Sequence, residues 1–106
     1  MSSRLQSVTD ADFDRVVERA IVPVLVEFWK PGCGHCKSLM KELEQLQGEL
    51  GEKVLVLTMN VDENFQISAE LEISSLPALA LYRNGSFERF IGGLGEKAAI
   101  RKQLGL

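Results

Sequence analysis

Two cysteines separated by two residues are the part of this sequence best suited to do chemistry. Cys33 and Cys36 are the only cysteines in the chain. Two intervening residues bring the second sulfur within bonding reach of the first on one helical turn, so the pair can pass between a dithiol and a disulfide. The spacing therefore predicts thiol–disulfide exchange, a reaction in which a thiolate attacks a disulfide sulfur.

The two cysteines are expected to play different parts. Because only the thiolate attacks, the nucleophile needs a lowered pKa, and the first turn of a helix provides it through unpaired N–H groups and the positive end of the dipole. Cys33 is predicted at that end, and Gly34 beside it leaves the approach open. Cys36 is predicted one turn deeper, where it is suited to resolve a mixed disulfide rather than to form one.

His35 is the only histidine and stands between the cysteines. Its cation or its N–H would stabilise a Cys33 thiolate, which makes the disulfide a stronger oxidant. A structural zinc site is one alternative, but zinc needs four ligands, and this turn supplies at most three with no second Cys/His pair elsewhere. Two inert buried thiols are the other alternative, which a place at a strand–helix junction disfavours. We therefore expect no metal.

A buried strand and a long helix must position this motif. Residues 22–29 are nearly all apolar, which predicts a strand covered on both faces, with Glu27 as its one ionisable residue. Four leucines at helical spacing then predict a helix over residues 33–50 that ends at Gly51. Cys33 is thus placed at the junction between the strand and the helix.

The other elements alternate along the chain. A capping pattern at Thr9 and Asp12 predicts a helix over residues 10–20, and Asp62 is predicted to cap a short helix that ends at Leu71. Strands are expected at residues 5–8, 54–59, 77–83 and 86–91, and Asn84–Gly85 predicts a hairpin turn between the last two. A last helix is expected around residues 99–104. The order predicts a parallel sheet with helices on both faces and an added antiparallel hairpin.

Composition limits the class of protein. The chain has 106 residues, 45% of them apolar and 25% charged, with a net charge of −3. This length is enough for one domain over residues 1–106 and too short for two. The acidic balance excludes an electrostatic nucleic-acid binder, and no apolar run approaches the roughly 20 residues of a membrane span. Because residues 1–7 show no signal peptide, we expect a cytoplasmic protein. We also expect a monomer.

Several motifs together resemble the thioredoxin family. The segment from Phe28 to Lys37 is similar to the family's active-site segment. Leu76–Pro77 falls where the family has its cis-proline, and Gly92 falls where it has a glycine after the last strand. Asn60-Val61-Asp62 resembles the end of the family's third strand. The resemblance covers the whole chain and implies the thioredoxin fold, a three-layer α/β/α arrangement with a central mixed sheet.

The resemblance also implies a groove for substrate beside the cysteines. Its walls would be the Leu76–Pro77 loop and the loop at Gly92, with Gly34 and Trp29 as further contacts. A cis Leu76–Pro77 peptide would expose the backbone of Leu76 for strand-like pairing with a substrate peptide. Trp29 could instead pack in the core rather than contact the substrate.

Glu27 falls at the position of the family's buried acid. Burial would raise its pKa and let it exchange a proton with Cys36 during the reaction. The alternative is a solvated acid on an edge strand, and the apolar run around Glu27 favours burial. Thr58 stands where many relatives place a lysine near this acid, so the pKa should rise further.

Two more positions depart from the family pattern, one in the groove and one that affects the redox potential. Gly32 stands where the family usually has a tryptophan, which removes apolar contact area beside Cys33. His35 replaces the proline of ordinary thioredoxins. The Cys-Gly-His-Cys form is similar to that of protein disulfide isomerases, which are more oxidising than thioredoxins by roughly 90 mV.

The resemblance implies a thiol–disulfide oxidoreductase that reduces protein disulfides through Cys33 and Cys36. It implies no bound cofactor, disulfide-containing proteins as substrates, and recycling by a flavin-dependent thioredoxin reductase that draws on NADPH. One alternative keeps this chemistry in a disulfide oxidase or isomerase. The other is a non-catalytic adaptor with the same fold, which would have little use for two reactive thiols.

Overall fold

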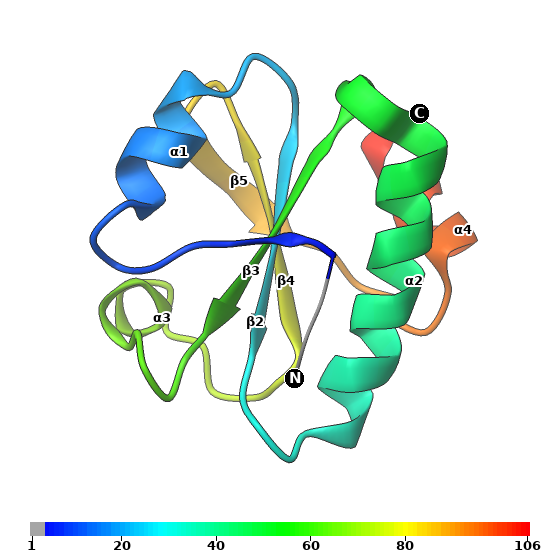
Figure 1. The fold of residues 1–106 in the computed structure, drawn as a ribbon. Coiled ribbons are helices and arrows are strands. Elements are labelled where there is room, and N and C mark those ends of the chain that lie inside the picture. The colour runs from blue at the N-terminus through cyan, green and yellow to red at the C-terminus, as the bar shows by residue number, and fades with distance from the viewer. Residues whose placement is uncertain (1–3) are drawn as a thin grey trace.

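A five-stranded mixed sheet forms the centre of the computed structural model, which describes residues 4–106 (Figure 1). The strands are β1 (Gln6–Ser7), β2 (Val24–Trp29), β3 (Leu55–Asn60), β4 (Ala78–Arg83) and β5 (Ser86–Phe90), in the spatial order β1-β3-β2-β4-β5. The strands β1, β3 and β2 are parallel, whereas β4 and β5 are antiparallel to their neighbours. Residues 1–3, part of the stretch without a signal-peptide pattern, lie outside the described residues.

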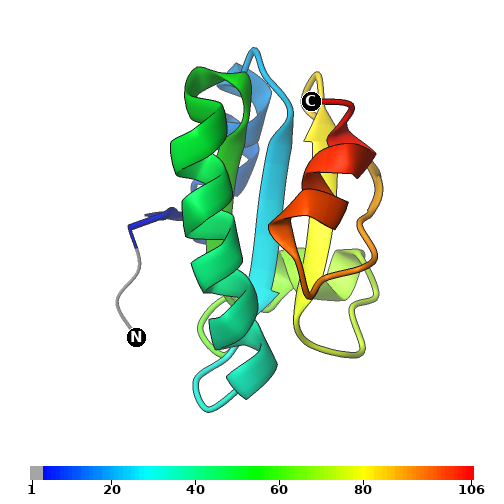
Figure 2. The same ribbon diagram turned by 90° about the vertical axis from the view of Figure 1, so that its right-hand side faces the viewer.

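Helices cover both faces of this sheet. Figure 1 shows α1 (Phe13–Arg19) and α3 (Gln66–Glu70) on one face, and α2 (Gly34–Leu50) and α4 (Lys97–Leu104) on the other. Figure 2 looks onto the face covered by α2 and α4. A short 3₁₀ helix, η1 (Gly51–Lys53), leads from α2 into β3. The predicted three-layer α/β/α arrangement is confirmed.

Alternation along β2 divides the core into two apolar clusters. Leu25 packs in the cluster beneath α2 and α4, whereas Val26 and Phe28 pack in the cluster beneath α1 and α3. Because successive side chains of a strand point to opposite faces, Glu27 points to the same side as Leu25, toward the layer of α2. The strand is buried on both faces, as its continuous apolar run predicted.

The helix α1 begins later than its capping pattern indicated. It starts at Phe13, and the preceding residues form a turn in which the Asp12 carboxylate accepts the Thr9 N–H at 2.7 Å and the Thr9 hydroxyl at 3.1 Å. The hydrogen bond from the Thr9 backbone lowers the pKa of Asp12. The pattern therefore marks the turn that leads into the helix rather than its first residue.

The prediction that Asp62 caps the following helix is wrong. The helix α3 begins at Gln66, and the N–H groups of Gln66 and Ile67 donate to the carboxylate of Asp10 at 3.0 and 3.1 Å. The amide oxygen of Asn64 in turn accepts the Asp10 N–H at 3.0 Å. Asp10 precedes Gln66 by 56 residues. A local sequence pattern carries no information about a partner so far away in the chain.

Gln47 continues the hydrogen-bond ladder of β3 from the neighbouring helix. Its Nε2 donates to the carbonyl groups of Val54 at 2.8 Å and Gly51 at 3.0 Å, and its Oε1 accepts the N–H of Val56 at 2.8 Å. In the described part of the chain, β1 pairs with β3 only at Leu57 and Thr58. The side chain of Gln47 thus supplies partners to backbone groups that no strand reaches on that side, and such groups are costly to leave unpaired.

Replacing Gln47 by alanine should destabilise the protein by about 1–3 kcal/mol, because backbone donors and acceptors around β3 lose their partners. Gln45→Ala is the control, since Gln45 lies on the exposed side of the same helix and its side chain accepts the Lys97 ammonium at the surface. Its effect should stay within about 0.5 kcal/mol. Urea unfolding followed by circular dichroism measures both values, and equal destabilisation of the two variants would contradict this account of Gln47.

Candidate active site

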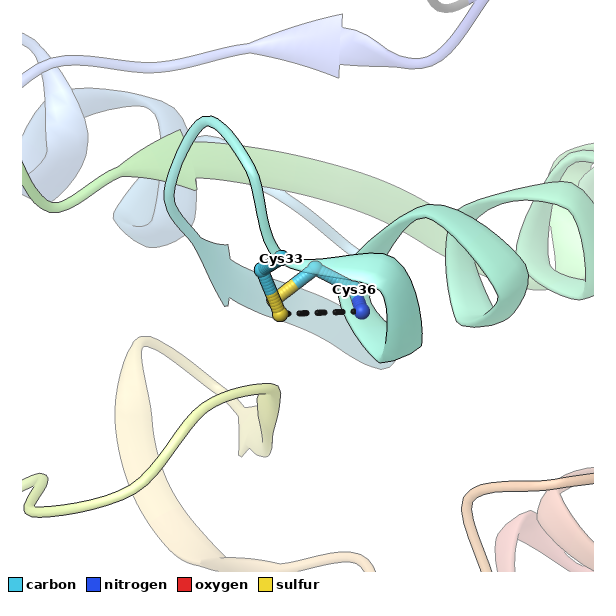
Figure 3. The surroundings of a disulfide bond; sticks show 2 residues. All are labelled: Cys33 and Cys36. Carbon is cyan, nitrogen blue, oxygen red and sulfur yellow. Dashed lines mark hydrogen bonds between the residues drawn. A yellow bond between two sulfur atoms is a disulfide. The ribbon is translucent and has the colours of Figure 1, made fainter.

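The cysteine pair lies where β2 has ended and α2 begins. Cys33 is the N-cap residue of α2, and its sulfur accepts the N–H of Cys36 at 3.1 Å (Figure 3). A disulfide joins the two residues, whose Cα atoms are 5.2 Å apart. A helix N-terminus stabilises negative charge through its free N–H groups and its dipole. The position predicted for the nucleophile is therefore the position that Cys33 occupies.

The two sulfur-bearing residues differ in exposure. Cys33 is partly exposed at the surface, whereas Cys36 has 0% exposure. The chain reaches Cys33 through Gly32, which has a φ of +84°, and no atom beyond Gly32 and its two chain neighbours lies within 4 Å of the place where a Cβ would stand. The surface beside Cys33 is thus open at Gly32, and Cys33 is the more accessible of the two cysteines.

A groove of about 530 Å³ runs past the cysteines. Cys33, Gly34 and His35 line one side of it, and both Gly34 and His35 are exposed. The opposite side is the segment that leads into β4, residues 73–76. The structure therefore brings Cys33, Gly34, His35 and Leu76 together around one hollow.

A second hollow of about 220 Å³ lies on the other side of His35. Pro77 lines it together with Leu94 and Gly95. The Leu76–Pro77 peptide is cis, as the family resemblance implied. The family resemblance pointed to Gly92 as the wall residue of this loop. Leu94 and Gly95, which follow it in the chain, line the hollow and were not predicted.

Gly92 is held by Gln103 from α4. The Gln103 Nε2 donates to the Gly92 carbonyl at 2.8 Å and to the Ala99 carbonyl at 3.2 Å, while its Oε1 accepts the Gly92 N–H at 3.3 Å. Arg89 in turn donates to the backbone carbonyl of Gln103 at 2.6 Å. Both backbone groups of Gly92 are therefore engaged inside the protein, and residues after it line the hollow. No local pattern marks Gln103 for this part.

Glu27 is completely buried, and burial raises its pKa to about 8. Its strand neighbours are Thr58 on β3 and Leu79 on β4. Neither carboxyl oxygen has a hydrogen-bond partner within residues 4–106. Desolvation without a compensating charge accounts for the direction of the shift, since it disfavours the ionised form.

Trp29 packs against the apolar cluster beneath α2. Its side chain is partly buried, and within residues 4–106 its indole N–H is buried without a hydrogen-bond partner. Trp29 lies two residues after Glu27 on β2, so the two side chains point to the same face of the sheet. It lines neither of the two hollows described above.

Across residues 4–106, no three His, Cys, Asp or Glu side chains are grouped so that they could hold a metal ion. Within the same residues, every helix is too short or too polar to cross a membrane.

Comparisons with known proteins agree with this geometry. The family model described as Thioredoxin matches residues 4–105. The chain is 40% identical to a thioredoxin of Rickettsia felis over 94 residues, which is 89% of this chain and 90% of the relative. It is 40% identical to a thioredoxin of Haemophilus influenzae over 83 residues, 78% of each chain. It is also 33% identical to thioredoxin 1 of a Nostoc species over 104 residues, 98% of this chain and 96% of the relative.

Fold, site and relatives thus agree over nearly the whole length of the chain. The sheet order with its flanking helices, the disulfide at the start of α2 and the cis-proline across from it occur together in one structure. The family match spans the same residues. The chain belongs to the thioredoxin family and is a thiol–disulfide oxidoreductase whose redox pair is Cys33 and Cys36.

Proposed function

We propose that this protein reduces disulfides of other polypeptides by a two-step exchange in which Cys33 attacks and Cys36 resolves. The observation that carries the proposal is the unequal exposure of the pair at the start of α2. The Cys33 thiolate attacks one sulfur of the target disulfide and displaces the other as a thiolate. Cys36 then attacks the Cys33 sulfur, the second target thiolate leaves, and the Cys33–Cys36 disulfide forms.

One cycle moves two electrons and two protons from the dithiol to the target. Cys36 must lose its proton before it attacks, and we assign Glu27 as the group that accepts it and later returns it. Two observations support this role: the carboxyl points to the side of the sheet that α2 covers, and burial raises its pKa to about 8. A group with such a pKa changes its protonation state near neutral pH.

Further residues are assigned to binding and to the redox potential. We assign His35 to stabilising the Cys33 thiolate, which its place in the first turn of α2 supports. Leu76 and Pro77 would hold the substrate chain, with Gly34 on the opposite wall of the groove. Gly92 and Trp29 would act on the groove indirectly. Gln103 holds the backbone of Gly92, and Trp29 packs against the apolar cluster beneath α2.

The oxidised protein needs a source of electrons to return to the dithiol. We assign this step to a flavin-dependent thioredoxin reductase that draws on NADPH, an assignment that the thioredoxin relatives support. The protein itself would bind no cofactor for the exchange. In this proposal it acts as a cytoplasmic monomer made of one domain over residues 1–106.

The Cys-Gly-His-Cys sequence favours a second candidate function, that of a disulfide oxidase or isomerase. His35 would stabilise the reduced form and raise the reduction potential, which drives electrons toward this protein rather than away from it. A measured reduction potential separates the two: a value near that of thioredoxin, about −270 mV, supports the reductase, and one near −180 mV supports the isomerase. An adaptor would show no turnover with a dithiol reductant and a disulfide substrate.

Brief treatment of the reduced protein with iodoacetamide should label Cys33, because its side chain is partly exposed while that of Cys36 is not. Cys36→Ser should accumulate mixed disulfides with oxidised insulin, since no resolving thiol remains. Cys33→Ser is the matched control and should trap none. Peptide mapping by mass spectrometry checks both results, and predominant label on Cys36 would reverse the assigned roles.

His35→Pro should make the protein a weaker oxidant, because the Cys33 thiolate loses a stabilising neighbour. The reduction potential should fall by tens of millivolts, where about 30 mV corresponds to roughly 1.4 kcal/mol. Equilibration with glutathione measures the potential. Lys102→Gln removes an exposed cation on α4 and should leave the potential unchanged. A potential that stays level or rises in His35→Pro would remove His35 from the role of tuning residue.

Glu27→Gln should slow the reduction of insulin and should change how stability depends on pH. The carboxyl titrates near 4.5 when unfolded and near 8 when folded, so the folded state binds more protons between these values. The wild type should therefore lose stability as pH rises through this window, and the glutamine variant should not. The advantage of the variant should grow to a few kcal/mol by about pH 8 and then level off.

Chemical unfolding at a series of pH values and the rate of insulin reduction are the two measurements. Glu52→Gln serves as the control, since Glu52 is exposed on η1. Its stability curve should run parallel to that of the wild type. If the Glu27→Gln curve also runs parallel to that of the wild type and the rate is unchanged, both assignments fail. Ionisation of Glu27 would then not destabilise the protein, and Glu27 would take no part in the proton transfer.

A further inference from the structure

A third hollow adjoins the groove at the cysteines. It has a volume of about 260 Å³ and lies between the segment that leads into β4 and the end of β5. Pro77 and Leu94 border both this hollow and the one beside His35. Ile73 borders both this hollow and the groove at Cys33. The three hollows are therefore parts of one continuous surface around the disulfide, and a bound polypeptide can occupy more than one of them.

Phe90 is the only aromatic residue that lines the third hollow. It is 43% exposed, an unusual state for a large apolar side chain. The wall around it combines apolar residues, among them Ile73, Ala78 and Leu94, with the polar residues Glu72, Ser74 and Ser75. Its exposed ring faces a hollow large enough for one side chain, so a substrate residue can bury apolar surface there.

A β-bulge sets the direction of this ring. Leu81 pairs with Arg89 and Tyr82 pairs with Phe87, so Glu88 is an extra residue in β5. In a regular strand, positions 87 and 90 would point to opposite faces of the sheet. The extra residue brings the two phenylalanines to the same face, where their ring centroids are 5.1 Å apart.

A row of aromatic rings then holds Phe90 in place. Its neighbour Phe87 packs edge-to-face on Tyr82 with a centroid distance of 5.7 Å, and Tyr82 packs on the buried Phe13 at 5.3 Å. The row begins in the core and ends at the hollow. A side chain that such contacts hold in place loses less conformational entropy on binding than a mobile one does.

The opposite end of the surface lacks such a group. Gly32 has no side chain, and no atom beyond Gly32 and its two chain neighbours lies within 4 Å of the place of a Cβ. Gly32 therefore adds no aromatic surface beside Cys33, whereas Phe90 adds an exposed aromatic ring to the hollow beside Pro77.

We propose that the hollow between Pro77 and Phe90 is a specificity subsite that binds an aromatic side chain of the polypeptide substrate, close to the cysteine that Cys33 attacks. This inference rests on the proposed reduction of polypeptide disulfides. An aromatic residue fits best because an edge-to-face contact with Phe90 adds to the burial of apolar area. Phe90 is thus a residue that determines specificity and takes no part in the exchange of electrons.

The test uses Gly/Ser peptides with one cysteine bonded to thionitrobenzoate and one phenylalanine placed at successive positions on either side of that cysteine. Reduction releases the peptide thiol and the coloured thionitrobenzoate thiolate, which reports the rate. Wild type, Phe90→Ala, Phe90→Tyr and Phe65→Ala are compared. Phe65 is the control, since it is 74% exposed and lines none of the three hollows. The small substrate bis(2-hydroxyethyl) disulfide reports the exchange chemistry alone.

One placement of phenylalanine should raise kcat/KM for the wild type about three- to tenfold over the peptide without it. Phe90→Ala should abolish this gain, Phe90→Tyr and Phe65→Ala should keep it, and all four proteins should reduce the small disulfide equally. A gain that survives in Phe90→Ala, or no gain at any placement, overturns the subsite.

Failure of the proposed function gives a different result, because the wild type would then not reduce even the small disulfide. In that case the subsite is tested by binding. The same peptides with serine in place of cysteine are titrated into the reduced protein and followed by amide chemical shifts. A phenylalanine-dependent affinity that disappears in Phe90→Ala supports the subsite, and equal affinity in both proteins overturns it.

Discussion

The packing of α2 onto the sheet is the contact on which the site depends. Leu39, Leu43 and Leu46 lie on the buried face of α2, and each is at most 1% exposed. Their burial holds the first turn of α2 at the end of β2, so Cys33 caps the helix at the surface while Cys36 turns into the protein. The same contact closes over Glu27 and raises its pKa to about 8, because the helix layer excludes water from the carboxyl. One apolar interface thus arranges Cys33, Cys36 and Glu27, the residues to which we assign attack, resolution and proton transfer.

The second helix on this face, α4, positions the groove by polar contacts. The Lys97 N–H donates to Glu42 of α2 at 3.1 Å, and the Lys97 ammonium bonds the Gln45 side chain at 2.8 Å. At the other end of α4, Gln103 engages both backbone groups of Gly92. Exposed contacts of this kind contribute little to stability individually. Their effect is to set the loop that carries Leu94 against Pro77, which shapes the hollows beside the disulfide.

Gly32 and Phe90 lie on different sides of the disulfide and differ in the apolar surface that they offer. Gly32 leaves the nucleophile open, and the aromatic row through β5 ends in an exposed ring next to Pro77. The exchange of electrons needs only the two sulfur atoms and a proton acceptor, so recognition can move along the surface without affecting the chemistry. The bulge at Glu88 also twists the edge strand, which discourages pairing of β5 with another chain. The same extra residue sets the direction of Phe90 in the proposed subsite.

The sequence by itself determined the order of the elements, the strand buried on both faces and the place of Cys33 at the start of a helix. These follow from hydrophobic period and from cysteine spacing, which are local properties of the chain. The site's resemblance to a known family added the cis-proline. Only the tertiary structure decided that Asp10 rather than Asp62 caps α3, that Gln47 completes the β3 ladder and Gln103 engages Gly92, and that Phe90 lines the hollow beside Pro77. In each of these contacts, packing brings together groups from different elements of the fold. A local sequence pattern therefore cannot identify the partner.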